Sequence, residues 1–307
     1  MKSSPHWAQI EERSFIWGIR LLLRVYLLCG RKVLQIFLYP VVSYYWLTNR
    51  PARLASQNYL RKIAAFTPLT PSLWLSFKHF ISFANALIDK LAAWSGALSP
   101  DDVQHYGRDK LLAETHKGRG VVLLGSHLGN LEVCRILADF DKALRINVLV
   151  HTKHAEKFNR LLNQTSDNSR LNLIQVTEIT AATAIMLSDK IEAGELVIIA
   201  ADRTPVSNSQ RVSLATFLGA EALFPQGAFI LAALLKCPVY TVFCLKQQDK
   251  YAVYFDHFSD RLNFPRKTRE QSIQHVVQLY ADSLQMYCLK EPLQWFNFFD
   301  FWHTDND

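Results

Sequence analysis

Hydrophobic positions form two different patterns along the chain, and the change comes near residue 99. Before it, long apolar stretches are interrupted by single basic residues, which is typical of helices that lie on a surface. After it, apolar runs of six or seven residues alternate with helical periodicity. We therefore predict an N-terminal helical region over residues 1–98 and a globular domain over residues 99–307.

The short apolar runs of the second part are the expected strands. They are apolar almost throughout, as in strands that are covered on both faces of a sheet. With helical patterns between most of them, they predict an α/β fold, a largely parallel central sheet flanked by helices. Ser99 to Asp102 predict a helix start, residues 251–255 an edge strand and residues 267–289 a closing helix. The five main strands are expected at residues 120–125, 145–150, 171–176, 196–201 and 239–245.

Charge separates the two parts further. Residues 1–88 contain eleven Lys and Arg against two Glu, a net charge of +9, so the remainder sums to −2 within a total of +7. On a helix, Arg13, Arg20, Arg24 and Arg31 fall within roughly 40° of one another, among leucine, isoleucine and aromatic side chains. This composition predicts contact with anionic lipid head groups.

Two further apolar stretches of this region bear on how the chain meets a membrane. Residues 33–47 are uncharged, but at ~1.5 Å per residue they fall short of the ~30 Å hydrocarbon core, and Pro40 is expected to break them. Residues 73–94 predict a second surface helix. We therefore expect a shallow or re-entrant anchor, with the packing of these helices against the globular domain as the alternative.

Composition excludes several classes of protein. Half of the residues are hydrophobic and only 20% are charged, which argues against disorder. The five cysteines form no C-x-x-C pair, so neither a disulfide framework nor a zinc knuckle is expected. No metal is expected at His151, His154 and Glu156, which fit a solvated helix face better. Nucleic acid is not expected as a partner, because the arginines sit among leucines.

Two polar clusters follow directly after predicted strands, where α/β proteins carry their chemistry. The first is GSHLGNLE at residues 125–132, and the second is ADRTP at residues 201–205. His127 and Glu132 would point ~140° apart on one continuous helix. They can cooperate only with His127 on a turn and Glu132 in the first turn of the next helix. One imidazole nitrogen would then bond to the carboxylate, and the other could take a proton from a hydroxyl group.

The residues alone leave alternatives open at both clusters. His127 is either such a general base, with nearby backbone N–H groups stabilising an oxyanion, or a structural histidine that caps a turn. Arg203 either binds a phosphate group or pairs with a carboxylate such as Asp202. The aromatic tail over residues 295–302 either closes the core or anchors the chain at a membrane.

The segment GSHLGNLE resembles the H-x4-D/E block of the superfamily of lysophospholipid and lipid A acyltransferases, especially the late lipid A acyltransferases. The similarity continues in order through residues 151–162, 194–205 and 215–240. The F-P-E-G-T-R block of the glycerolipid branch has no full match, and residues 201–205 occupy its place in the order. This departure favours an acceptor other than glycerol phosphate and a branch of predicted acyltransferases.

This resemblance implies a bacterial acyltransferase at the cytoplasmic face of the inner membrane. The acyl donor would be acyl carrier protein or acyl-coenzyme A, the acceptor a hydroxyl group of a lipid or glycolipid, and no cofactor is expected. His127 and Glu132 would be the catalytic pair. The substrate-binding residues would be Ser126, Gly129, Asn130, Asp202 and Arg203. The rival functions are a thioesterase or lipid hydrolase that uses water, and a non-catalytic lipid-binding protein of the same fold.

Overall fold

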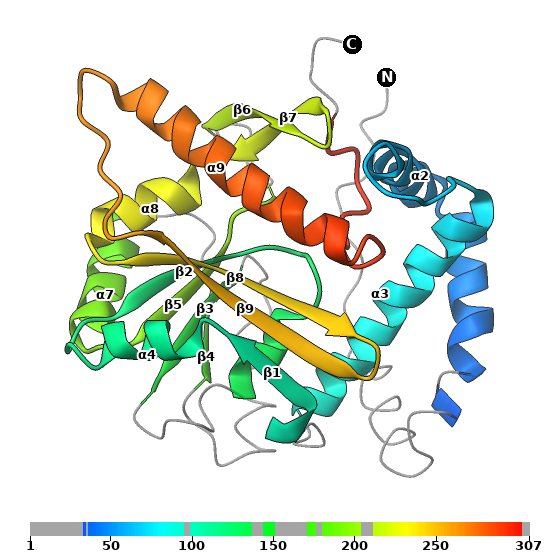
Figure 1. The fold of residues 1–307 in the computed structure, drawn as a ribbon, viewed down its shortest axis with the longest axis horizontal. Helices are drawn as coiled ribbons and strands as arrows, with labels where there is room; N and C mark the ends of the chain where they lie inside the picture. The colour runs from blue at the N-terminus through cyan, green and yellow to red at the C-terminus, as the bar shows by residue number, and fades with distance from the viewer. Residues whose placement is uncertain are drawn as a thin grey trace.

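The structure is a computed structural model, and it describes residues 33–34, 36–94, 99–136, 144–150, 171–175, 180–203 and 211–302. A seven-stranded sheet forms its centre, in the order β1-β9-β8-β2-β5-β3-β4 (Figure 1). From β8 to β4 all neighbours are parallel, whereas β9 pairs antiparallel with β8 and β1 runs parallel with β9. The strands are β1 (Val103–Tyr106), β2 (Val121–Gly125), β3 (Ile146–Val150), β4 (Leu171–Gln175), β5 (Leu196–Ala200), β8 (Val239–Gln247) and β9 (Lys250–Ser259).

The predicted α/β fold with a largely parallel sheet is confirmed, including all five main strands. Alternate residues of the central strands point to opposite faces, because side chains alternate along a strand. Val122 and Leu124 of β2 face one apolar cluster, and Val121 and Leu123 face another. The first cluster is covered by α7 (Ala181–Glu192), α8 (Gly227–Leu235) and α9 (Arg269–Lys290), and the second by α4 (Arg108–Thr115) and the 3-10 helix η3 (Leu131–Ile136).

The far edge of the sheet differs from the prediction. Residues 251–255 do form a strand, but β9 lies between β1 and β8, so β1 is the edge. Ser99 to Asp102 do not begin an α-helix: residues Pro100–Asp102 make one 3-10 turn, η2, that leads directly into β1. The four residues of β1 are too few to show a hydrophobic period, which is why the pattern did not predict a strand there.

A small antiparallel hairpin of β6 (Val212–Phe217) and β7 (Ala220–Pro225) packs beside α9, and the sequence pattern did not predict it (Figure 1). Glutamines on α9 complete its outer edge. Gln278 accepts from the amide and donates to the carbonyl of Thr216, and Gln274 donates to the carbonyl of Leu214. These side chains satisfy backbone groups that a third strand would otherwise bond.

The N-terminal helical layer consists of the helix over residues 36–48, α2 (Arg50–Ala64) and α3 (Leu73–Trp94), on one side of the sheet (Figure 1). The helix expected over residues 73–94 is confirmed. The break expected at Pro40 is wrong, since residues on both sides of Pro40 are helical. Among the described residues, no helix is both long and apolar enough to cross a bilayer.

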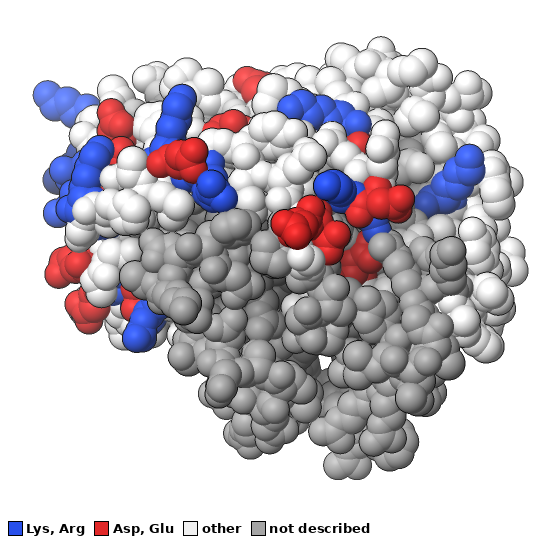
Figure 2. Space-filling model, turned by 60° about the horizontal axis from the view of Figure 1, so that its bottom comes forward, with Lys and Arg blue, Asp and Glu red and all other residues white. Residues whose placement is uncertain are grey.

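The layer exposes many large apolar side chains even though one side of it packs on the body. Phe37, Tyr44, Leu73 and Trp74 are each more than half exposed, while Phe80 and Ile88 of α3 are buried. Figure 2 shows a wide uncharged area toward the upper right of the coloured surface, with single Lys, Arg, Asp and Glu side chains beside it. The arginine stripe over residues 13–31 and the segment over residues 151–170, with its expected solvated face, lie outside the described residues.

Candidate active site

Strand register brings two distant parts of the chain together. β2 and β5 are neighbouring parallel strands with Gly125 opposite Ala200, and the amide of Ala201 donates to the carbonyl of Gly125 over 2.9 Å. Because the two strands are parallel and in register, they end at the same edge of the sheet. The residue two places beyond β2 therefore lies beside the residue two places beyond β5. These residues are His127 and Asp202. The carboxyl ends of adjacent parallel strands therefore form the site, as is usual in open α/β sheets.

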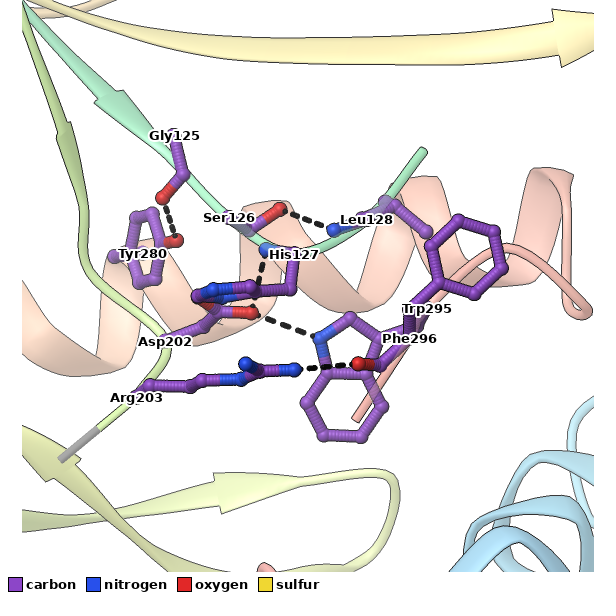
Figure 3. A network of polar contacts seen from close by, with 9 residues as sticks. All are labelled: Gly125, Ser126, His127, Leu128, Asp202, Arg203, Tyr280, Trp295 and Phe296. Carbon is purple, nitrogen blue, oxygen red and sulfur yellow. Dashed lines mark hydrogen bonds and ion pairs between the residues drawn. The ribbon is translucent and has the colours of Figure 1, made fainter. Parts of the chain in front are cut away.

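His127 and Asp202 are joined by two hydrogen bonds. Nδ1 of His127 lies 2.7 Å from Oδ1 of Asp202, and the backbone N–H of His127 donates to Oδ2 over 2.8 Å (Figure 3). Because an ionised carboxylate can only accept, Nδ1 carries the proton and Nε2 holds a lone pair. Nε2 has no hydrogen-bond partner among the described residues, and about a third of the imidazole side chain is exposed. The arrangement leaves a basic nitrogen accessible.

Burial and charge set the protonation of both groups. Burial lowers the pKa of His127 below its ordinary value of 6.5, although Asp202 acts to raise it, and Arg203 lowers it further. Burial alone would raise the pKa of Asp202, but the charge and hydrogen bonds of His127, with the charge of Arg203, hold it below its ordinary value. At neutral pH the pair is a neutral imidazole beside a carboxylate, which is the state that a general base needs.

The loop that carries His127 is fixed from both sides. The amide of Asn130 donates to the carbonyl of Cys244 in β8, and the amide of Gly129 donates to the carbonyl of Gln294. Gly129 has a φ of +71°, and a Cβ there would stand 1.8 Å from the carbonyl oxygen of Cys244. Only glycine fits at this position. The loop is therefore held rigidly between β8 and the C-terminal segment.

The expected use of backbone amides as an oxyanion hole does not hold for residues 127–130. His127 donates to Asp202, Leu128 donates to Oγ of Ser126 over 3.1 Å, and the amides of Gly129 and Asn130 bond to backbone carbonyls. All four donors are committed within the protein. Ser126, which was expected to bind substrate, is buried and instead stabilises the turn.

Gly129 and Asn130, also expected to bind substrate, line a cavity of about 520 Å³ beside the His127 loop. Its other walls come from α3 and from the turn between β8 and β9, and include Lys78, Asn85 and Gln248. The lining combines lysine, amide, hydroxyl and carboxylate groups with apolar side chains such as Ile81 and Phe296. The cavity therefore offers both hydrogen-bonding groups and apolar surface to a ligand.

Arg203 lies on the opposite side of the pair from the sheet. Its Nη2 donates to the carbonyl of Phe296 over 2.6 Å, and its Cζ is 5.7 Å from the ring centre of Phe299. Its buried Nε has no hydrogen-bond partner within the described part of the chain. Burial lowers the pKa of Arg203, while Asp202 raises it, and the guanidinium stays charged because its ordinary pKa lies far above neutral pH. An unsatisfied donor on a buried cation is a candidate contact for a substrate oxygen.

Two carboxylates bear on His127: the contact of Asp202 is seen in the structure, whereas that of Glu132 is predicted from the sequence. The role of fixing the imidazole, which the sequence analysis gave to Glu132, belongs to Asp202 at Nδ1 in the structure. Glu132 lies in η3, and its side chain is outside the described residues, so its pairing with His127 stays a prediction. Asp202, expected to contact substrate, is fully buried and bonded to the protein through both oxygens. It reaches a substrate only through His127.

Trp295 is a member of the site that no sequence pattern indicated. Its indole N–H donates to Oδ2 of Asp202 over 3.0 Å, and it is fully buried. The aromatic tail was correctly noted as a candidate for core closure, and burial of Trp295, Phe296 and Phe301 shows that this part of it does close the core. No spacing or motif connects residue 295 with residue 202, so only the folded chain identifies this contact.

These features define a class of protein: an α/β protein with a histidine held by an aspartate at the carboxyl end of its parallel strands. The sequence profile described as bacterial lipid A biosynthesis acyltransferase matches residues 79–304, and the chain belongs to this family. A comparison with individually curated proteins found no match. The family indicates an acyltransferase and confirms the resemblance that the sequence motifs carried.

Proposed function

We propose that this protein transfers a fatty acyl group from a thioester to a hydroxyl group of a lipid, with His127 as the general base. The observation that carries the proposal is the imidazole of His127, with Nδ1 bonded to a buried carboxylate and Nε2 accessible and unpartnered among the described residues. Family membership supports acyl transfer to a lipid. The donor is an acyl carrier protein or acyl-coenzyme A.

The reaction follows from the protonation of the pair. Nε2 of His127 takes the proton of the acceptor hydroxyl as the oxygen attacks the thioester carbonyl carbon. The carbon–sulfur bond then breaks, the acyl group remains on the acceptor oxygen, and the leaving thiolate takes the proton back from the imidazolium. Asp202 keeps the ring oriented and stabilises the imidazolium while it exists. Glu132 is proposed as a second carboxylate of this centre, on the basis of the H-x4-E spacing.

Two features support places for the substrates. The unpartnered Nε of Arg203 is available to an oxygen of the reacting thioester, or to a phosphate of the acceptor or of the donor arm. The cavity beside Asn130 offers room for the head group of a lipid or glycolipid acceptor. Arg203 adjoins Asp202 in the chain, and Gly129 of the cavity lining lies two residues beyond His127. We propose that the acceptor approaches from the side of the cavity and the thioester from the side of Arg203.

The N-terminal helical layer is proposed to hold the enzyme on a bilayer that contains anionic lipids. Its exposed side chains, such as Phe37, Tyr44 and Trp74, form an apolar surface of a kind that soluble monomers rarely leave open to water. The net charge of +9 over residues 1–88 would favour an anionic surface. These features fit attachment to the cytoplasmic face of a bacterial inner membrane, the side on which acyl thioesters are made.

The test is an assay of the purified protein in mixed vesicles with labelled acyl carrier protein or acyl-coenzyme A. The acceptors to compare are a lysophospholipid, a neutral glycolipid and a phosphorylated glycolipid. We expect His127→Ala to lower acyl transfer at least ~10³-fold, because proton removal by the base is lost. The matched control is His257→Ala, since His257 also contacts an aspartate, Asp260, over 2.9 Å but lies on the exposed surface of β9.

The products separate the rival functions. Release of free fatty acid with every acceptor would identify a thioesterase or lipid hydrolase. Absence of any turnover, with vesicle binding intact, would identify a lipid-binding protein without activity. Full activity of His127→Ala alongside His257→Ala would remove His127 from the reaction and overturn the mechanism.

A further inference from the structure

The C-terminal segment runs beside the loop that carries His127. The amide of Phe296 donates to the carbonyl of His127 over 2.9 Å, and Leu128 pairs with Trp295 in an antiparallel bridge. The carbonyl of Gln294 accepts from Gly129. These contacts fix the backbone of Trp295 relative to His127, although the two residues are far apart in the sequence. The position of the Trp295 indole is therefore set by the same strand-like pairing that sets the base.

The indole of Trp295 meets the far oxygen of the carboxylate that holds His127. Oδ2 of Asp202 accepts from Nε1 of Trp295 over 3.0 Å and from the backbone N–H of His127 over 2.8 Å (Figure 3). Oδ1 is left to Nδ1 of the imidazole, at 2.7 Å. Two donors on Oδ2 prevent the carboxylate from rotating. Oδ1 therefore keeps the orientation in which it accepts the hydrogen bond from Nδ1 of His127.

We propose that Trp295 is a positioning residue for the acyl-transfer reaction, acting through Asp202 to keep Nε2 of His127 as the basic nitrogen. The inference rests on the proposed role of His127. Trp295 is fully buried and touches no substrate, so its effect is on the orientation and basicity of the pair. Its N–H draws negative charge toward Oδ2 and so limits how strongly Asp202 favours a protonated imidazole.

Trp295 is itself held in place by aromatic packing. Its ring centre lies 5.0 Å from those of Tyr59 and Phe301 and 5.1 Å from that of Phe217, all in edge-on contacts. Edge-to-face contacts of this kind favour one ring orientation over others. The indole N–H therefore points to Asp202 without depending on that one hydrogen bond for its direction.

A chain of buried hydrogen bonds also holds the backbone of Trp295 from the N-terminal helical layer. Nε2 of His79 lies 2.9 Å from the carbonyl of Trp295, and a carbonyl can only accept, so Nε2 donates. Burial lowers the pKa of His79 to about 4, so the ring is neutral and its Nδ1 accepts from Ser56 over 3.0 Å. Ser76 then donates to Ser56 and accepts from the indole of Trp46. Every donor in this series of hydrogen bonds has one acceptor.

The test replaces the indole and keeps an aromatic ring. For Trp295→Phe we expect kcat to fall ~10- to 10²-fold with KM little changed, because a small misplacement of the base is enough to cost this much. We also expect the acid limb of the pH profile to move to higher pH, because the full charge of Asp202 then favours the imidazolium. The matched control is Trp302→Phe, whose indole lies in the same cluster but donates to the carbonyl of Phe217.

A double variant distinguishes positioning from general packing. In an Asp202→Asn background, adding Trp295→Phe should cost little more, because the indole acts through that carboxylate. Losses that add fully, together with an acid limb that stays where the wild-type limb lies, would overturn the proposal. Should Trp295→Phe fail to fold, benzothienylalanine at position 295 keeps the size of the ring system and replaces N–H with sulfur, and the same results are expected from it.

The proposal has a readout that needs no acyl transfer. The pKa of His127 can be followed by NMR titration of its ring protons, identified by their absence in His127→Ala. We expect this pKa to rise in Trp295→Phe and to stay unchanged in Trp302→Phe. Inactive wild-type protein would remove the proposed function, whereas an unchanged His127 pKa in Trp295→Phe would remove this inference alone.

Discussion

The end of the sheet at His127 and the N-terminal helical layer both reverse the usual distribution of side chains. At the sheet, Asp202 and the imidazole of His127 bring charge and polarity into the interior. On the layer, Phe37, Tyr44 and Trp74 bring large apolar surfaces into contact with solvent. Each arrangement is unfavourable for an isolated soluble domain. We propose that each is explained by what it meets: a reacting hydroxyl group at the sheet, and lipid at the layer.

The two regions differ in how tightly they are held. Around His127 nearly every polar atom has a partner, and the loop is fixed by β8 and by the segment at residues 294–296. The exposed face of the layer has no such network, and its side chains can adapt to a disordered surface. Chemistry needs fixed geometry, whereas attachment to lipid needs mainly area. We therefore expect variants of the exposed face of the layer to leave the chemistry at His127 intact, and variants of His127 or Asp202 to leave vesicle binding intact.

The largest effect is expected at the carboxylate that orients the base. In Asp202→Asn the oxygen must stay at the Oδ2 position, because the amide of His127 and the indole of Trp295 both donate there. The new NH₂ group then faces Nδ1 and forces the imidazole proton onto Nε2, where the base must accept. We expect kcat to fall ~10²–10³-fold. Vesicle binding should not change, and both are measured on the same preparation.

This variant sharpens the comparison because it alters one atom and no volume. An activity within a factor of two of the wild type would show that Asp202 does not set the tautomer of His127. In that case Glu132→Gln, measured in parallel, should show the fall in kcat instead, as the H-x4-E spacing predicts.

The next effect is expected at the lipid-facing layer. Replacing Phe37, Leu73 and Trp74 together with serine removes three exposed apolar side chains, each worth up to about 1.5–3 kcal/mol when fully buried. We expect binding to anionic vesicles to weaken at least ~10²-fold. The matched control replaces Ile185 of α7 and Leu234 of α8, which are also exposed but lie away from the layer. Sedimentation with vesicles measures both.

Turnover of a short-chain thioester in solution should be the same in the wild type and the serine variant. Equal vesicle binding by the layer variant and the control variant would show that this apolar face does not meet lipid. Loss of turnover in solution would show that the layer and the site are not separable, contrary to the comparison.

The smallest effect concerns pH. Activity requires neutral His127, whose pKa burial lowers below 6.5 despite the charge of Asp202. The rate therefore rises with pH through this lowered pKa, and the acid limb should lie below pH 6.5. Profiles of kcat/KM with soluble thioester check this. A limb above pH 6.5 would show that Asp202 outweighs burial at the imidazole.

Much of the fold follows from local sequence, and the failures have physical causes. The five main strands and α9 were predictable because the buried strands are continuous apolar runs and α9 has a clear helical period. β1 has four residues, and the β6–β7 hairpin has exposed positions beside buried ones, so neither run was distinctive. Pro40 does not end its helix: the residues on both sides of it are helical.

The sequence by itself determined the α/β class, the two strand ends that hold the polar clusters and the apolar, basic character of the first hundred residues, and it predicted His127 as the base. These properties depend on local sequence patterns, which are the same whether or not the chain is folded. Only the tertiary structure decided that Asp202 faces His127 and that Trp295 faces Asp202. The reason is that the register of β2 against β5 and the return of the C-terminal segment depend on contacts between residues far apart in the chain, which no local spacing records.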